Sequence, residues 1–141
     1  MLYAILCYND ERAVGSWTRA EDDACMARLT AVEDKLRAAN RMGPVARLLP
    51  TTAATTLRKG KDEPMVLDGP FAETKEQLLG FYVVECAGLE AALDVARDLA
   101  AANPRGGAYE VRPLAVFRNG DAGKAVAAAG GVIHGGGGYG T

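Results

Sequence analysis

The chain has 141 residues, of which 49% are hydrophobic and 24% charged, a composition typical of one globular domain and too apolar for a fully disordered protein. Sixteen Lys and Arg residues against eighteen Asp and Glu give a formal net charge of −2, so no basic excess points to nucleic acid. No apolar run approaches the roughly 20 residues that cross a bilayer. The first eight residues lack the features of a signal peptide, so we expect a cytoplasmic protein with no membrane contact.

The first half of the chain predicts a strand followed by a long helix. Residues 2–8 are apolar at nearly every position, which is typical of a central strand. Residues 18–21 (Thr-Arg-Ala-Glu) match a capping box, and an apolar stripe then recurs with helical period, at Cys25, Leu29, Val32, Leu36 and Ala39. Charged residues, Glu33 among them, occupy the face that we expect to meet solvent. Residues 40–44 end the helix, with Gly43 available for a left-handed turn.

The second half predicts five more strands and a second helix. Residues 45–49 form a short strand, and residues 54–58 and 64–67 form a hairpin around Lys-Gly-Lys-Asp. Residues 80–86 form an apolar strand, residues 89–102 a helix, and residues 109–114 the last strand. Glycine and alanine dominate from residue 119 onward. We therefore expect one domain over residues 1–117 and a flexible tail over residues 118–141.

This order of elements is typical of the α+β, ferredoxin-like class, in which two helices cover one face of an antiparallel sheet. The strand over residues 80–86 is apolar on both faces, with Phe81 and Val83 on one and Tyr82 and Val84 on the other. Two helices can cover only one of these faces. We therefore predict that a second copy of the chain covers the other, forming a homodimer.

The three cysteines, Cys7, Cys25 and Cys86, form no Cys-x-x-Cys pair, and their spacing relative to His134 fits no zinc site. We interpret them as small buried side chains in a reducing compartment. We expect no metal and no other cofactor.

The least generic segment is residues 68–82, Asp-Gly-Pro-Phe-Ala-Glu-Thr-Lys-Glu-Gln-Leu-Leu-Gly-Phe-Tyr. Asp68, Gly69 and Pro70 form a turn, and charge then gathers at Glu73, Lys75 and Glu76 ahead of an apolar strand. One interpretation is a solvated turn that carries an ion pair. The other is a cleft in which neighbouring charges shift the pKa values of these groups for proton transfer.

This segment resembles the signature of the YCII-related family, in the branch that carries an Asp-Gly-Pro-Phe motif, and the resemblance extends over residues 1–117. It implies a ferredoxin-like subunit of a dimeric α/β barrel, a fold shared with small oxygenases and lactone isomerases, and it implies little about chemistry. Some members lie beside genes for extracytoplasmic-function sigma factors. Other branches carry a His at the start of the first helix, proposed to act with an Asp. Residues 18–28 contain no His here, so that pair is not carried over.

Two functions of different class fit these observations. The first is a metal-free cleft enzyme for acid–base chemistry on a small molecule. Its candidate catalytic residues are Asp68 as a base, Glu73 and Glu76 as an acid–base pair, and Lys75 as a stabiliser of negative charge; Tyr8, Tyr82 and Arg112 are candidate pocket residues. The second is a non-catalytic module for a small ligand or a protein, for instance an accessory to sigma-factor-linked transcription.

A third interpretation makes the segment purely structural. Asp68 would accept backbone amides, and Lys75 would pair with Glu73 or Glu76. The exposure of Glu73, Lys75 and Glu76 separates the interpretations, because acid–base chemistry needs them in a closed pocket rather than in bulk water.

Overall fold

The computed structural model describes residues 1–122; most of the predicted tail, with His134, lies outside the described residues. In chain order the elements are β1 (Leu2–Asn9), α1 (Glu11–Gly15), α2 (Arg19–Ala38), β2 (Met42–Arg47), the 3₁₀ helix η1 (Thr51–Ala53), β3 (Thr55–Arg58), β4 (Met65–Asp68), β5 (Gln77–Glu85), α3 (Leu89–Ala102) and β6 (Ala108–Pro113). Over these residues, no helix is both long and apolar enough to span a membrane.

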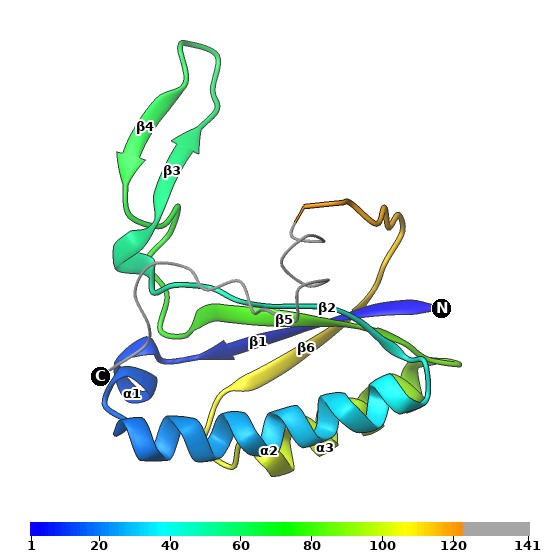
Figure 1. The fold of residues 1–141 in the computed structure, drawn as a ribbon. Coiled ribbons are helices and arrows are strands. Elements are labelled where there is room, and N and C mark those ends of the chain that lie inside the picture. The colour runs from blue at the N-terminus through cyan, green and yellow to red at the C-terminus, as the bar shows by residue number, and fades with distance from the viewer. Residues whose placement is uncertain (123–141) are drawn as a thin grey trace.

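Four of the strands form one antiparallel sheet in the order β2-β5-β1-β6. Both long helices, α2 and α3, lie against the same face of this sheet (Figure 1). The prediction of an α+β fold with an antiparallel sheet is confirmed, and the arrangement is compatible with the ferredoxin-like class. We call the sheet face that the helices leave uncovered the open face.

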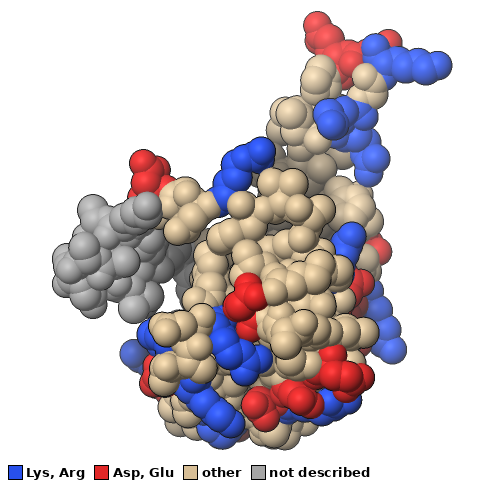
Figure 2. Space-filling model, turned by 90° about the vertical axis from the view of Figure 1, so that its right-hand side faces the viewer, with Lys and Arg blue, Asp and Glu red and all other residues tan. Residues whose placement is uncertain are grey.

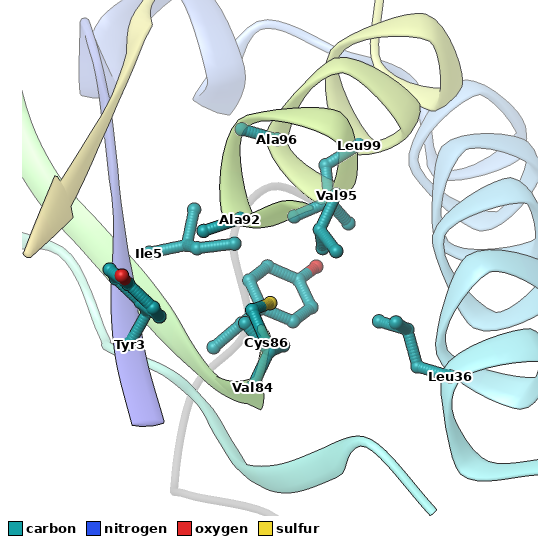
Figure 3. Close-up of a cluster of buried hydrophobic side chains, with 10 residues drawn as sticks. Tyr3, Ile5, Leu36, Val84, Cys86, Ala92, Val95, Ala96 and Leu99 are labelled. Carbon is teal, nitrogen blue, oxygen red and sulfur yellow. The ribbon is translucent and has the colours of Figure 1, made fainter. Parts of the chain in front are cut away.

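The main core lies between the sheet and the helices, where side chains from β1, β5 and α3 converge (Figure 3). Ile5, Val84 and Leu99 are fully buried at its centre. Strand alternation places Tyr82, Val84 and Cys86 on this face, as the sequence predicted. On α3 the buried stripe is Ala92, Val95, Ala96, Leu99 and Ala102, and its small alanines allow the helix to lie close to the sheet.

Helix α2 begins with the predicted capping box. The Glu21 amide donates to Thr18 Oγ1 over 3.1 Å, and the Thr18 amide donates to Glu21 Oε2 over 3.2 Å. Of its predicted apolar stripe, only Cys25 and Leu36 are buried, whereas Leu29 and Val32 are only partly buried. The helix therefore packs less tightly on the sheet than α3 does.

The turn after α2 differs from the prediction. Asn40, with φ 57°, is the left-handed residue, and Gly43 lies in β2 instead. A Cβ on Gly43 would come within 2.7 Å of the Val83 carbonyl oxygen, so glycine is needed there for the close approach of two strands. Pro44 is tolerated in the same strand because β2 is at the edge of the sheet.

The hairpin β3–β4 extends away from the sheet on the side opposite the helices (Figure 1). We call residues 55–68 the arm. Its predicted pairing is confirmed, with Thr55 opposite Asp68 and Arg58 opposite Met65. Figure 2 shows charged side chains at its far end, beyond a stem with few charges. Along the arm, Leu57, Met65 and Val66 are exposed, and Phe71 just after it is 73% exposed.

Candidate functional site

A cavity of about 120 Å³ lies between α2 and the sheet; we call it the inner cavity. It exists because the apolar stripe of α2 does not close fully onto β1 and β5. Most of its lining is apolar. The residues that line it include Cys7, Val14, Trp17, Asp22, Cys25, Met26, Leu29, Glu33, Val45, Arg47, Leu79, Tyr82, Asn103 and Tyr109.

One end of the inner cavity is closed by Trp17. Trp17 packs with Val14 and Cys25 in a second buried cluster, and the Arg105 guanidinium lies 5.0 Å from the centre of its ring. Arg105 is itself paired with Glu21 over 3.3 Å. Beyond Trp17 lies a second cavity of about 170 Å³, which we call the outer cavity. Trp17, Cys25 and Asn103 line both cavities. These three side chains therefore form the boundary between the two spaces.

The inner cavity reaches the surface between α2 and the edge strand β2. Met26 and Val45, on either side of this opening, are 39% and 41% exposed. Beside them the Arg47 guanidinium donates to Asp22 Oδ1 over 3.0 Å, which joins strand to helix. The opening is thus apolar, with one ion pair across it.

Burial raises the pKa values of the thiol and phenol groups in the cavity wall. It raises the pKa of the Cys7 thiol to about 12 and that of Tyr109 to about 12. It also raises the pKa of Tyr82, and neighbouring ionisable groups, Cys7 and Glu33 among them, add to this effect. The Cys25 thiol has a raised pKa for the same reason. None of these thiols is therefore activated as a nucleophile.

Glu33 is one of two carboxyl groups in the cavity wall, and Asp22 is the other. Burial raises the pKa of Glu33 above the ordinary value of 4.5, which the Arg37 charge partly counteracts. Within residues 1–122, Glu33 makes neither a hydrogen bond nor an ion pair (Arg37 pairs with Asp34 instead). The prediction that Glu33 lies on the solvent face is confirmed only in part, because its side chain is half-buried and also lines the cavity. Positions 25, 29 and 33 share one helix face, and this spacing was the signal that could have placed Glu33 beside the apolar stripe.

Asn103 contributes an unusual polar atom. Its Oδ1 is buried and has no hydrogen-bond partner, and it is the single side-chain atom of this kind in the described part of the chain. Its backbone amide ends α3 by donating to the Leu99 carbonyl over 3.0 Å. The sequence indicated a helix end at Asn103 but gave no signal that its side chain would line a cavity.

The structure separates the seven predicted site residues into three places. Tyr82 lies in the inner cavity. Tyr8 and Arg112 lie on the open face, opposite Ala108 and Ala4 in the pairing of β1 with β6. The four charged residues of the motif are exposed in the single chain and line no described cavity: Asp68, Glu73, Lys75 and Glu76. A single chain thus does not bring the predicted catalytic and pocket residues together.

The motif instead connects the arm to the rest of the protein through hydrogen bonds that each involve a backbone group. The Gly69 amide donates to the Ala54 carbonyl over 2.8 Å, and Thr56 Oγ1 donates to the Gly69 carbonyl over 2.8 Å. Further along, Gln77 Nε2 donates to the Thr74 carbonyl, and Gln77 Oε1 accepts from the Glu11 amide. These contacts support a bracing role, although through atoms other than the Asp68 carboxylate and the Lys75 amine.

No three His, Cys, Asp or Glu side chains within residues 1–122 gather as a metal site. The fold and cavity define a small α+β domain with a mostly apolar cavity between helix α2 and its sheet. The sequence profile of the YCII-related domain family matches residues 1–118, and the chain belongs to this family. It is 60% identical, over 121 residues, to an uncharacterized protein of Rhizobium meliloti (strain 1021), covering 86% of this chain and 98% of that protein. Membership of the branch with the Asp-Gly-Pro-Phe motif stays a prediction from residues 68–71.

Proposed function

We propose that this YCII-related protein binds a small, largely apolar molecule in the inner cavity. The observation that carries the proposal is the cavity itself, with apolar walls, a few converging polar groups and an opening beside β2. Protein interiors are normally packed without such voids. Water that enters this cavity through its opening finds few hydrogen-bond partners along the apolar wall. An apolar molecule that displaces this water would therefore bind favourably.

A cavity-filling substitution tests the proposal. Leu29→Phe enlarges a side chain of the cavity wall, and Leu89→Phe makes the same change at an exposed position at the start of α3. In a thermal-shift screen of small apolar molecules, we expect compounds that raise the Tm of the wild type and of the Leu89→Phe variant but not of Leu29→Phe. Compounds that stabilise Leu29→Phe equally would place the binding site elsewhere, and a screen without any stabilising compound would contradict the proposal.

Acid–base catalysis is the second candidate, and the position of Glu33 favours it. A carboxyl group with a raised pKa beside an apolar cavity suits proton transfer to or from a bound molecule. Catalysis by Asp68, Glu73, Lys75 and Glu76 requires, by contrast, that a second chain cover them, because all four are exposed here. Once a substrate is found, loss of turnover in Glu33→Gln with full turnover in Glu76→Gln would assign the chemistry to the cavity; the reverse would assign it to the motif.

We further propose that two copies associate through their open faces. The strands β1 and β5 present Ala4, Leu6 and Phe81 on that face, each half-buried in the single chain, and the arm adds exposed apolar side chains beside it. Sedimentation velocity at micromolar concentration is expected to give a species of twice 14.8 kDa, which Leu6→Lys converts to the monomer. A folded wild-type monomer under these conditions would contradict the proposal.

A further inference from the structure

Three acidic or basic side chains of the described residues line the inner cavity, and one of them lacks a counter-charge: Asp22, Glu33 and Arg47. Arg47 donates to Asp22 over 3.0 Å, so these two compensate each other. The cation nearest to Glu33 along α2 is Arg37, which donates to Asp34 over 2.8 Å instead. The cavity wall therefore carries one acidic group without a bonded partner.

The carboxyl oxygens of Glu33 are within reach of a bound molecule. Glu33 is half-buried, and Asn103 Oδ1 is the single buried side-chain atom without a hydrogen-bond partner in residues 1–122. The unpartnered oxygens of Glu33 are therefore both accessible. The Glu33 charge also adds to the raised pKa of Tyr82, which lines the cavity from β5. The carboxyl group thus lies within electrostatic reach of the opposite wall.

The shape of the cavity favours a chain-like occupant. Helix α2 lines it with residues spaced by four, three and four positions along one helix face, namely Asp22, Met26, Leu29 and Glu33. Eleven residues correspond to about 16 Å along the helix axis. A cavity of about 120 Å³ that extends over this length is narrow. Its polar groups lie at the two ends, and the middle is apolar.

The Glu33 end favours a cation. Burial weakens the solvation of the ionised carboxyl group, which raises its pKa, and a cation beside it would offset that loss. Hydrogen bonds between an ammonium group and a carboxylate are among the stronger ones in proteins. An anionic molecule would meet repulsion from Glu33 and would have to displace Asp22 from Arg47 to find a partner.

We propose that the inner cavity binds unbranched primary alkylammonium ions, with the alkyl chain along Leu29 and Met26 and the ammonium group donating to the Glu33 carboxylate. This inference rests on the proposed function of small-molecule binding in that cavity. It assigns Glu33 as the residue that selects among molecules of similar length by the charge of their head group.

Hexylamine, hexan-1-ol and hexanoate form a matched series, since they share a six-carbon chain and are cationic, neutral and anionic at pH 7. Titration calorimetry on the full chain is expected to show hexylamine binding at least about 5-fold more tightly than hexan-1-ol, and hexanoate binding most weakly. In Glu33→Gln, which keeps the size and removes the charge, hexylamine and hexan-1-ol should bind within about twofold of each other, with the hexan-1-ol affinity kept. Glu63→Gln makes the same change at an exposed position in the turn of the arm, and this control should keep the wild-type preference.

The outcomes separate this inference from the proposed function. Equal binding of hexylamine and hexan-1-ol to the wild type, or an amine preference that survives in Glu33→Gln, would overturn the role of Glu33 and leave cavity binding intact, provided that Leu29→Phe abolishes the binding of hexan-1-ol. Tighter binding of hexanoate than of hexylamine would overturn the preference for cations. Failure of all three probes to bind the wild type would overturn this inference, whereas the proposed function is decided by the thermal-shift screen. If Leu29→Phe does not fold, Met26→Trp enlarges a more exposed side chain of the same wall, and the same criteria apply.

Discussion

Arg47 in β2 and Asp22 in α2 form an ion pair at 3.0 Å that joins the edge strand to the helix beside the opening of the inner cavity. Their side chains are 36% and 21% exposed, so solvent and salt screen this pair less than the other ion pairs on α2. The pair limits how far the helix and the strand can separate where a molecule would enter.

Removing this ion pair is expected to destabilise the protein modestly. Asp22→Asn keeps the shape of the side chain and removes its charge, and we expect a loss of about 0.5–1 kcal/mol in urea unfolding. Asp23→Asn is the matched control, because the partner of Asp23 is Arg19, at 3.9 Å in an exposed pair, and we expect a smaller effect there. Equal losses in the two variants would show that the pair at the opening has no special value.

Asn103→Leu is expected to stabilise the ligand-free protein. A buried acceptor without a partner costs about 1–3 kcal/mol, and an apolar side chain of similar volume removes that cost. We expect the free energy of unfolding to rise by about 1 kcal/mol, measured by chemical denaturation without any added ligand. A loss of stability would instead mean that Asn103 supports the end of α3 through its side chain.

Glu33 is expected to make stability fall as pH rises above 4.5. Because its pKa is raised in the folded chain, the folded state holds its proton over an interval in which the unfolded state has lost it. The stabilisation is complete below the unfolded pKa and is lost as pH rises through the raised folded pKa. Glu33→Gln, which stays neutral, should therefore be more stable than the wild type at pH 7, with the difference vanishing near pH 4. Thermal melts at both pH values test this, and a constant difference would contradict it.

The positions of most helices and strands were predictable from the sequence because they depend on local sequence signals. The capping box at Thr18, the apolar stripe of α3 and the turn residues of the arm each act within a few residues. The short helix α1 was missed because its single buried residue, Val14, gives no periodic pattern. The position of Gly43 was missed because its requirement comes from Val83, on another strand.

The candidate site was harder to predict because it depends on imperfect packing between distant segments. A sequence stripe shows which face of α2 points inward but not how closely that face approaches the sheet. The cavity, with Asn103 from the end of α3 and Arg47 from β2, arises only when these elements are assembled. The charged motif has an unusual sequence, which suggested a chemical role. Part of that sequence is instead explained by hydrogen bonds to backbone carbonyls within residues 69–77.

Buried hydroxyl and thiol groups are expected to destabilise the protein at alkaline pH. Cys7 and Tyr109 have ordinary pKa values of 9.0 and 10.0, and burial raises both to about 12. The folded state therefore keeps protons that the unfolded state loses, and stability falls as pH rises from about 9 toward 12. Tyr109→Phe should reduce this slope in melts between pH 8 and 11. Ionisation of all five tyrosines near pH 10 in the folded protein, followed at 295 nm, would contradict the prediction.

Gly80 explains one part of the motif in physical terms. It lies in β5 opposite Arg47 and is buried, and a Cβ there would collide with the Ala46 carbonyl oxygen on the neighbouring strand. Because backbone atoms on both strands are fixed by the sheet, the strain cannot be relieved by a rotamer change.

We expect Gly80→Ala to cost about 3 kcal/mol in chemical denaturation and to widen the gap between β2 and β5 beside the inner cavity. Gly15→Ala, where nothing lies within 4 Å of the added carbon, is the matched control and should change stability little. A mild effect of Gly80→Ala would mean that β2 can slide along β5, so that the position of Arg47 at the cavity opening is not held by the sheet.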